Sequence, residues 1–195
     1  MKIQSLRGMH DLFPTELEKW YFFESKLLAI FNSYNVKEIR TPILESEELF
    51  SRSVGNSSDI VNKELYSFSD RNDEIVCLRP EGSASVIRAI IQKKLENEKH
   101  KLWYQGPMFR YERPQKGRFR QFHQVGVEYL GYEEGFSEYE LISMILHINR
   151  SLEIDDYIIK INHLGDPEAK EKFSKSLISY LEPYKSDLHA TDQIR

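Results

Sequence analysis

Four residues that could bind a polar ligand alternate along one predicted strand, at residues 122–130. Because successive side chains of a strand point to opposite faces, they share one face. They are Phe122, Gln124, Gly126 and Glu128. A polar face inside a buried sheet costs free energy unless something binds there, and a glycine leaves room for a ligand to approach the backbone. The opposite face, from His123 to Tyr129, is mainly apolar and predicts a core.

The preceding predicted strand, at residues 102–110, supplies complementary groups. Arg110, at its end, and Glu112, just beyond, share one face. Simple antiparallel pairing places these two side chains near Phe122 and Gln124. The result is an arginine for a phosphate, an aromatic ring for a base and polar groups for a small polar substrate. The alternative is an exposed sheet face with ordinary charges, and alternation alone does not decide between the two.

The loop between these strands is strongly basic. Five cations stand within eleven residues, against a single acid, Glu112. They are Arg110, Arg113, Lys116, Arg118 and Arg120. Such a cluster suits a polyphosphate or a nucleic-acid backbone, although a solvated basic loop is the commoner outcome for a run of charges.

A third polar cluster joins a predicted strand to a predicted helix at residues 78–83, Leu-Arg-Pro-Glu-Gly-Ser. Glu81 stands at the helix entrance and could bind an ammonium group. Locally, the favoured interpretation is simpler, because Glu81 and Ser83 can cap the helix.

The elements that must position these residues mix hairpins with helices. Helices are predicted from Thr15 to Phe31, with a Thr15–Glu18 capping box, at 46–53, at 83–95, from a second capping box at Ser137 and Glu140, and after Asp166-Pro167. Strands are predicted at 36–39, 65–68, 75–78, 102–110, 122–130 and 157–161, with residues 69–73 as a hairpin turn. The order predicts an α+β fold around a largely antiparallel sheet flanked by helices.

Composition excludes several classes of protein. The 195 residues are 40% hydrophobic and 30% charged, with a net charge of −4, which is typical of a globular domain that is not basic overall. The single cysteine, Cys77, stands in an apolar run and favours a core position and a reduced compartment. No metal-ligand pattern, phosphate-binding glycine loop, catalytic triad, signal peptide or membrane-spanning run is present in the sequence.

Four segments resemble histidyl-tRNA synthetases, which are class II aminoacyl-tRNA synthetases. Residues 7–11 (Arg-Gly-Met-His-Asp) resemble their N-terminal signature, and residues 38–45, with Pro42, resemble motif one. Residues 78–83 resemble the amino-acid-binding segment, and residues 106–124 resemble motif two almost letter for letter. The resemblance weakens after about Asn162, and Asn35-Val36 and Ser83 depart mildly from the family pattern.

The resemblance implies a role for each matched residue. Arg110 would bind the α-phosphate of ATP, Glu112 the adenine amino group, and Phe122 would stack under the adenine. Arg113 and Arg118 would contact phosphates. Histidine would be bound by Glu81, Ser83, Arg110, Gln124 and Glu128. Gln115 and Arg120 would lie near the tRNA acceptor end, and the strand with Pro42 would form a dimer interface.

The implied reaction has two steps, histidine activation to histidyl-adenylate and transfer to tRNA(His), with ATP and Mg²⁺ and without a metal held by the protein alone. The resemblance also implies a cytoplasmic homodimer that has no membrane association. The expected architecture for residues 1–195 is the N-terminal portion of the catalytic domain, truncated before motif three and the anticodon-binding domain. A cut sheet is expected to expose apolar surface, and the chain alone is expected to be inactive.

Two other functions remain possible at this point. The synthetase-like regulatory subunit of ATP phosphoribosyltransferase, in histidine biosynthesis, shares the fold but usually departs at residues 78–83 and in the basic loop. A free-standing fragment that binds only ATP or RNA is the other alternative.

Overall fold

Two long antiparallel strands organise the N-terminal part of the protein, which was analysed as a computed structural model. The structure describes residues 3–54, 64–113, 115–133, 135–162 and 165–189. Strands β5 (His100–Phe109) and β6 (Gln121–Leu130) pair from His100↔Leu130 to Phe109↔Gln121, which confirms the predicted hairpin. The short strand β1 (Lys37–Glu38) lies parallel to β5 and completes a sheet in the order β1-β5-β6.

A second three-stranded sheet has the order β2-β4-β3 and is wholly antiparallel. Its strands are β2 (Leu44–Ser46), β3 (Tyr66–Ser69) and β4 (Ile75–Leu78). The predicted hairpin around residues 69–73 is confirmed, because Asp70 Oδ1 accepts from the Asn72 and Glu74 amides within the turn. The α+β class with largely antiparallel pairing is therefore confirmed, with the strands divided between two sheets.

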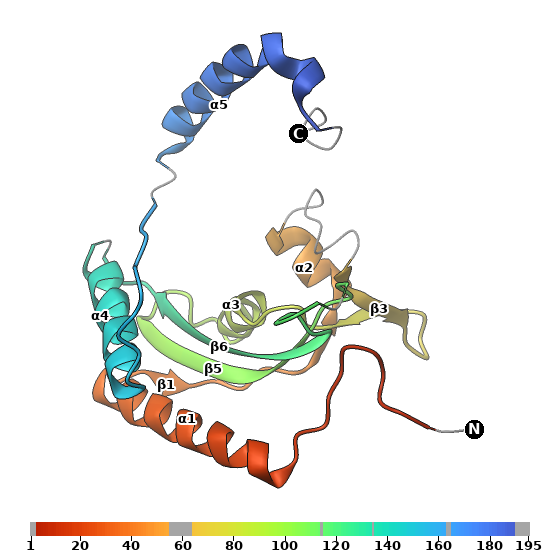
Figure 1. Cartoon of the computed structure of the whole chain (residues 1–195), viewed down its shortest axis with the longest axis vertical. Coiled ribbons are helices and arrows are strands. Elements are labelled where there is room, and N and C mark those ends of the chain that lie inside the picture. The colour runs from red at the N-terminus through yellow and green to blue at the C-terminus, as the bar shows by residue number, and fades with distance from the viewer. Residues whose placement is uncertain (1–2, 55–63, 114, 134, 163–164, 190–195) are drawn as a thin grey trace. The chain divides into compact units, whose positions relative to one another are not determined.

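Helices cover both faces of the β1-β5-β6 sheet (Figure 1). Helices α1 (Pro14–Ser33) and α4 (Phe136–Ser151) bury Leu27, Phe31 and Met144 against Trp103 of β5. Helix α3 (Ser83–Gln92) contributes Val86 to a core on the other face. The neighbours Trp103 and Tyr104 are both buried, at 5% and 4% exposure, because they face opposite cores.

Helices α2 and α3 contact the β2-β4-β3 sheet through an ion pair and a small apolar cluster. Arg88 of α3 pairs with Glu45 of β2 at 2.7 Å. Helix α2 (Glu47–Val54) packs Phe50 against Cys77 and Ala84. Cys77 is fully buried, as predicted, and burial raises the pKa of its thiol to about 12. It is a core residue and not a reactive thiol.

Both predicted capping boxes are wrong by two residues. At α1, Glu16 Oε2 accepts from the Phe13 amide at 3.3 Å, and Pro14 occupies the first turn, where its missing N–H costs nothing. At α4, Glu138 accepts from the Gly135 amide at 2.6 Å, and Gly135 has φ +86°. Each helix begins where a glutamate accepts from the backbone amide three residues before it. The hydroxyls of Thr15 and Ser137 do not determine where either helix begins.

Residues Asp156–Arg195 form a separate compact unit. Helix α5 (Pro167–Leu181) begins as predicted, because Asp166 Oδ1 accepts from the Ala169 amide at 2.7 Å; a 3₁₀ turn, η2 (Glu182–Asp187), follows it. The predicted strand at 157–161 is wrong, since these residues carry no strand in the described part of the chain. Ile158 is 84% exposed, so its apolar pattern has no sheet to join.

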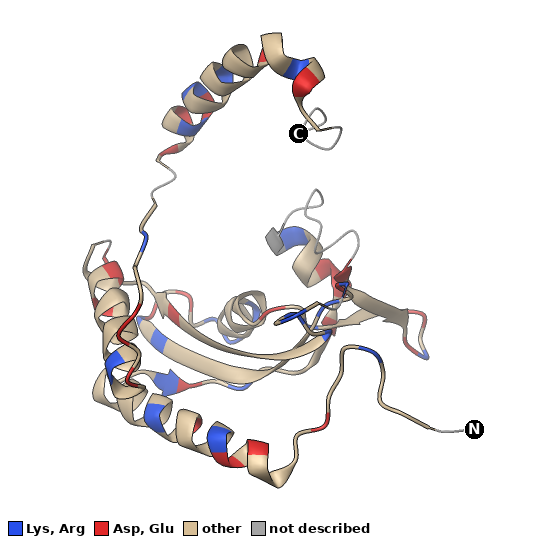
Figure 2. Cartoon of the chain, viewed as in Figure 1, with Lys and Arg blue, Asp and Glu red and all other residues tan. Residues whose placement is uncertain are grey.

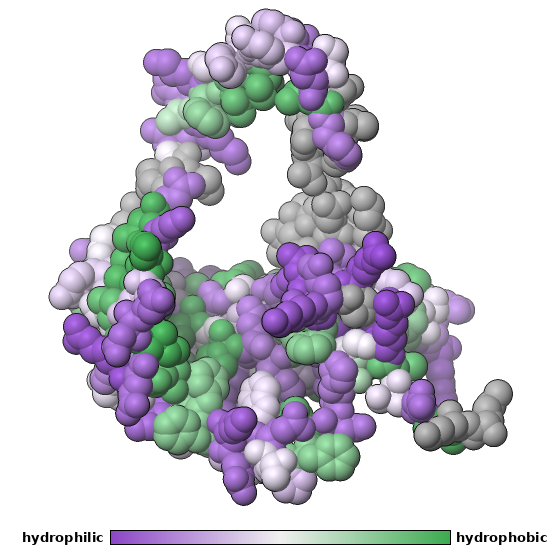
Figure 3. All heavy atoms as spheres, in the orientation of Figure 1, coloured by the Kyte–Doolittle hydropathy of each residue, from purple (hydrophilic) through white to green (hydrophobic). Residues whose placement is uncertain are grey.

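Apolar side chains are exposed on helices α5 and α1. Figure 3 shows an apolar stripe along α5, where Phe173 and Ile178 are exposed. Tyr21 and Phe22 are likewise exposed on α1. No helix in the described ranges combines the length and apolar character needed to cross a membrane.

Candidate active site

A pocket of about 380 Å³ opens at the end of β5 and β6, where the basic loop leaves the sheet. It is lined by seven residues, which we call the Arg110 pocket: Arg110, Glu112, Gly117, Arg118, Phe119, Phe122 and His123. The hairpin register explains the grouping, because Met108 pairs with Phe122 and the Arg110 amide donates to the Arg120 carbonyl at 2.9 Å. Arg110 and Glu112 therefore lie near Phe122, as predicted, whereas Gln124, which was predicted to join them, pairs with Gly106 and does not line this pocket.

In the Arg110 pocket a single carboxylate, Glu112, is shared by two arginines, so one positive charge is left without a matching negative charge. The Arg110 guanidinium lies 5.1 Å from the Phe122 ring centroid, and its Nε donates to the Pro80 carbonyl at 2.9 Å. Glu112 stands between two arginines, with Arg118 Nη1 at 3.1 Å and Arg110 Nη1 at 3.9 Å. An incoming anion could replace the carboxylate at either arginine. Acidic and basic residues are also interspersed elsewhere along the ribbon, for example on α1 (Figure 2).

A second cluster lies farther along β6, at the start of α3; we call Glu81, Ser83, Tyr104 and Glu128 the Ser83 corner. Ser83 Oγ donates to Glu128 Oε1 at 2.5 Å. Glu81 accepts from the amides of Ser83 and Ala84, at 2.6 and 3.0 Å. Of the two predicted caps, Glu81 therefore caps the start of α3, whereas the Ser83 hydroxyl bonds to Glu128 and not to a helix amide.

Tyr104 is the residue of this corner that the sequence did not single out. A Cβ added at Gly82 would lie 2.1 Å from its ring, and one added at Gly126 would lie 2.2 Å away. The two glycines therefore make the slot that the ring fills. Burial raises the pKa of the Tyr104 hydroxyl, and a hydrogen bond with Ser83 opposes that shift. The available signal was its register position directly opposite Gly126.

Arg79 is a second residue that was missed. It is 5% exposed, and its guanidinium donates to the carbonyl oxygens of Thr41 and Pro107 at 2.9 and 3.1 Å. A Cβ at Gly106 would lie 2.5 Å from Arg79 Nη2. This arginine holds the segment before β2 against β5 and does not line the Arg110 pocket.

Gln124 lies between the two clusters, opposite Gly106. Its Oε1 is buried and accepts no hydrogen bond among the described residues. A buried amide oxygen without a partner is costly, so this atom is a candidate contact for a ligand. From Phe122 to Glu128 the strand rises about 20 Å, long enough for a nucleotide at one end and a small molecule at the other.

The remaining predicted site residues lie outside both clusters. Arg113 and Gln115 are exposed in the basic loop, and neither lines the Arg110 pocket. Arg120 is half-buried; its guanidinium carbon lies 3.9 Å from the Tyr111 ring centroid and its Nε donates to the Glu112 carbonyl at 3.2 Å. In this structure Arg120 therefore stabilises the loop from within.

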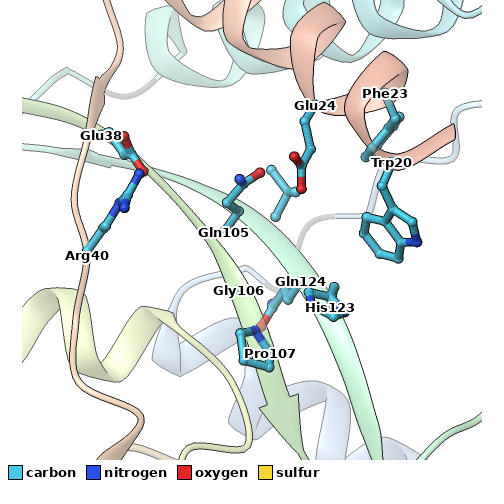
Figure 4. Close-up of a pocket in the computed structure, with 11 residues that line it drawn as sticks. Trp20, Phe23, Glu24, Glu38, Arg40, Gln105, Gly106, Pro107, His123 and Gln124 are labelled. Atoms are coloured by element: carbon cyan, nitrogen blue, oxygen red, sulfur yellow. The ribbon is translucent and has the colours of Figure 1, made fainter. Parts of the chain in front are cut away.

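A separate pocket of about 300 Å³ lies on the α1 side of the sheet (Figure 4). Trp20 and Glu24 of α1 point toward His123 and Gln105, and the Trp20 and His123 rings lie 4.7 Å apart. Glu38 and Arg40 pair with each other at 2.7 Å on its rim. Within the described ranges, no group of three or more His, Cys, Asp or Glu side chains could hold a metal ion.

Comparison with known proteins decides the family. The model of the histidyl-tRNA synthetase family matches residues 8–165. The chain belongs to the histidyl-tRNA synthetase family. The histidine–tRNA ligase of Francisella philomiragia is 46% identical over 190 residues, which is 96% of this chain and 45% of that protein. The chain thus spans about 45% of this curated relative.

Solved structures agree with the family assignment. An apo histidyl-tRNA synthetase from S. aureus has a TM-score of 0.79 at 36% identity, over 100% of this chain and 46% of that one. A Bacillus halodurans protein described as an ATP phosphoribosyltransferase regulatory subunit/histidyl-tRNA synthetase has a TM-score of 0.68 at 22% identity, over 80% of this chain and 39% of that one. The second likeness shows only the fold that the histidyl-tRNA synthetase family shares with it.

Proposed function

We propose that this chain is the N-terminal portion of the catalytic domain of a histidine–tRNA ligase, which activates histidine with ATP and transfers it to tRNA(His). The observation that carries the proposal is the arrangement on one side of the β5-β6 hairpin. The Arg110 pocket and the Ser83 corner lie at opposite ends of the same strand face, with the unpartnered Gln124 amide oxygen between them. This arrangement suits a nucleotide and an amino acid that must meet.

The Arg110 pocket is proposed to bind ATP. The Phe122 ring offers a stacking surface for adenine, and Glu112 can accept from its amino group. Arg110 and Arg118 then exchange Glu112 for phosphate oxygens. Arg113 would reach the phosphates only by moving from its exposed position. Mg²⁺ would be carried chiefly by the phosphates, a usual mode for this ion, and would supply charge neutralisation.

The Ser83 corner is proposed to bind histidine. Glu81 and Glu128 offer carboxylates to the ammonium group and the imidazole, and Ser83 orients Glu128 through its hydroxyl. Gln124 would contact the bound histidine near its carboxylate, where that carboxylate meets the α-phosphate of ATP. Arg110 stabilises the charge that develops there, so positioning and electrostatics carry the activation step.

The partners follow from the same proposal. Gln115 and Arg120 in the basic loop are proposed to contact the tRNA acceptor end, for which Arg120 would have to leave the Tyr111 ring. A homodimer through the motif one region is supported by the exposed Ile43 and Leu44 within that segment. A cytoplasmic location is supported by the single, buried and free Cys77.

The test is histidine-dependent exchange of pyrophosphate into ATP. It is measured on the 195-residue chain and on the same chain extended with the remaining part of the Francisella relative. We expect exchange only in the extended chain, because the present chain covers 45% of that relative. Exchange with another amino acid but not with histidine would contradict the proposal. Absence of exchange combined with binding to an ATP phosphoribosyltransferase catalytic subunit would favour the regulatory function instead.

A further inference from the structure

We propose that the N-terminal segment, residues 3–13, positions the basic loop of the Arg110 pocket, with Gly8 as the positioning residue. The segment has no regular secondary structure apart from a turn, in which the Met9 amide donates to the Leu6 carbonyl at 3.0 Å. Most of its residues are exposed, but Gly8 is buried. Figure 1 shows the segment running from the N-terminus to the start of α1.

The Gly8 carbonyl accepts two hydrogen bonds at the point where the loop returns to the sheet. Its donors are the amides of Arg120, at 2.8 Å, and Gln121, at 3.2 Å. Gln121 is the first residue of β6, so this contact lies next to the last pair of the β5-β6 ladder, Phe109↔Gln121. Without Gly8, these two amides at the base of the loop would need water as their acceptor.

The contact reaches the proposed ATP ligands through a single residue, Arg120. Its carbonyl accepts from the Arg110 amide at 2.9 Å, and its Nε donates to the Glu112 carbonyl at 3.2 Å. Arg120 is therefore held by Gly8 through its backbone amide, and it holds the Arg110 backbone through its carbonyl and the Glu112 backbone through its side chain. A shift of the segment is transmitted to both ligands without any contact between Gly8 and the nucleotide.

Only glycine fits at this position. Gly8 has φ +80°, in the left-handed region, and an added Cβ would lie 3.0 Å from Arg120 Cγ and 3.2 Å from the Arg120 amide nitrogen. Any other residue would be strained in its own backbone and would push against the peptide that it must hold. The close approach and the backbone conformation thus select the same residue for independent reasons.

The segment also borders the pocket through His10. The His10 and Phe119 rings meet edge to face at 4.8 Å, and Phe119 lines the Arg110 pocket. A neighbouring cavity of about 570 Å³, lined by His10, Trp20 and Phe119 among others, shares Phe119, Phe122 and His123 with that pocket. The segment therefore forms one wall of the cavity next to the Arg110 pocket.

The contact itself is tested by hydrogen exchange on the 195-residue chain, independently of any enzymatic activity. In Gly8→Ala, the amides of Arg120 and Gln121 should exchange about tenfold faster, at the lower end of the effect of such strain. Amides in the middle of β6 should keep their rates. Gly135→Ala is the matched control, because Gly135 also has a positive φ, +86°, but a Cβ there meets no atom within 4 Å. Equal exchange at Arg120 and Gln121 in wild type and Gly8→Ala would overturn the proposal.

The consequence for the site rests on the proposed function and is tested in the extended chain. Gly8→Ala and a variant lacking residues 1–9 should raise the KM for ATP about tenfold, as expected if the ordered loop becomes a minor state, and leave the KM for histidine unchanged. Equal changes in both KM values, or unchanged values despite faster exchange at Arg120, would overturn the positioning role. If the wild-type extended chain shows no histidine-dependent activity, the proposed function fails and the hydrogen-exchange result alone decides whether the segment holds the loop.

Discussion

We call the face of β6 that carries Phe122, Gln124, Gly126 and Glu128 the proposed ligand face. Its two ends are held in different ways. At the Phe122 end, charged side chains partner one another. Arg118 is 63% exposed, and Glu112 divides its carboxylate between two arginines. At the Glu128 end, Ser83 lies in a turn that Glu81 caps, and its hydroxyl donates to Glu128. The buried Tyr104 ring fills a slot between two glycines.

The difference shows how a site can be mobile at one end and fixed at the other. Ion pairs near the surface contribute little to stability, so their members can change partners when an anion arrives. A ring in contact with two glycines cannot move without a change in backbone spacing. Substitutions at the Phe122 end should therefore affect catalysis, and those at the Glu128 end should affect folding as well.

The largest effect is expected at the Phe122 end. Arg110→Gln in the extended chain should lower kcat for pyrophosphate exchange by about 10²–10³-fold, because a preorganised positive charge at the α-phosphate is lost. The thermal unfolding midpoint should change little. Arg52→Gln, which removes an exposed pair with Glu48 on α2, should leave the rate unchanged. A rate in Arg110→Gln within tenfold of wild type would remove Arg110 from the catalytic role.

The next effect belongs to the Glu128 end and concerns stability. Gly126→Ala should lower the free energy of unfolding by about 2 kcal/mol, because the added methyl group collides with Tyr104. In urea denaturation, the double variant Gly126→Ala/Tyr104→Leu should be less destabilised than the sum of the single variants, since the smaller side chain relieves the collision. Strict additivity would show that the slot does not constrain the ring.

A smaller effect is expected at Ser83, where a substitution should weaken the binding of histidine and leave that of ATP unchanged. Ser83→Ala should raise the KM for histidine about tenfold by removing the hydroxyl that orients Glu128, and leave the KM for ATP unchanged. Ser83→Thr keeps the hydroxyl and should behave like the wild type. If alanine and threonine had the same effect, the hydroxyl would not be the group that matters.

The smallest effect is expected away from both ends, at the ion pair between Lys101 and Glu140. Burial would raise the pKa of Glu140, but the interactions with Lys101 and Tyr129 together outweigh it, so this pKa lies below its ordinary value of 4.5. A lowered folded-state pKa stabilises the protein above the ordinary pKa, and the stabilisation is lost as the pH falls through the folded-state value. Glu140→Gln should therefore cost about 1 kcal/mol at pH 7 and nothing near pH 2.

Equilibrium unfolding at the two pH values measures this difference for Glu140→Gln. Both KM values in the extended chain should stay at the wild-type level, because the pair lies between β5 and α4 and touches neither end of the proposed ligand face. An equal loss of stability at both pH values would show that packing, and not charge, accounts for the effect.

Short-range patterns predicted much of this fold. The period of two along residues 122–130 correctly predicted strand β6, and Asp166-Pro167 predicted the start of α5. The same local rules misplaced two caps, because each helix start contains a second glutamate. Glu16 at α1 and Glu138 at α4 each accept from a backbone amide two residues before the predicted cap. The predicted strand at 157–161 failed because β structure needs a partner, which its own sequence does not contain.

By itself, the sequence determined the family, the antiparallel hairpin and the residues of the proposed ligand face, because each depends on residue types at fixed spacing. Only the tertiary structure decided which of them meet. It placed Tyr104 between Gly82 and Gly126, used Arg79 to join β5 to the segment before β2, and brought Gly8 against Arg120. These contacts join residues far apart in the chain, so local pattern carries no record of them.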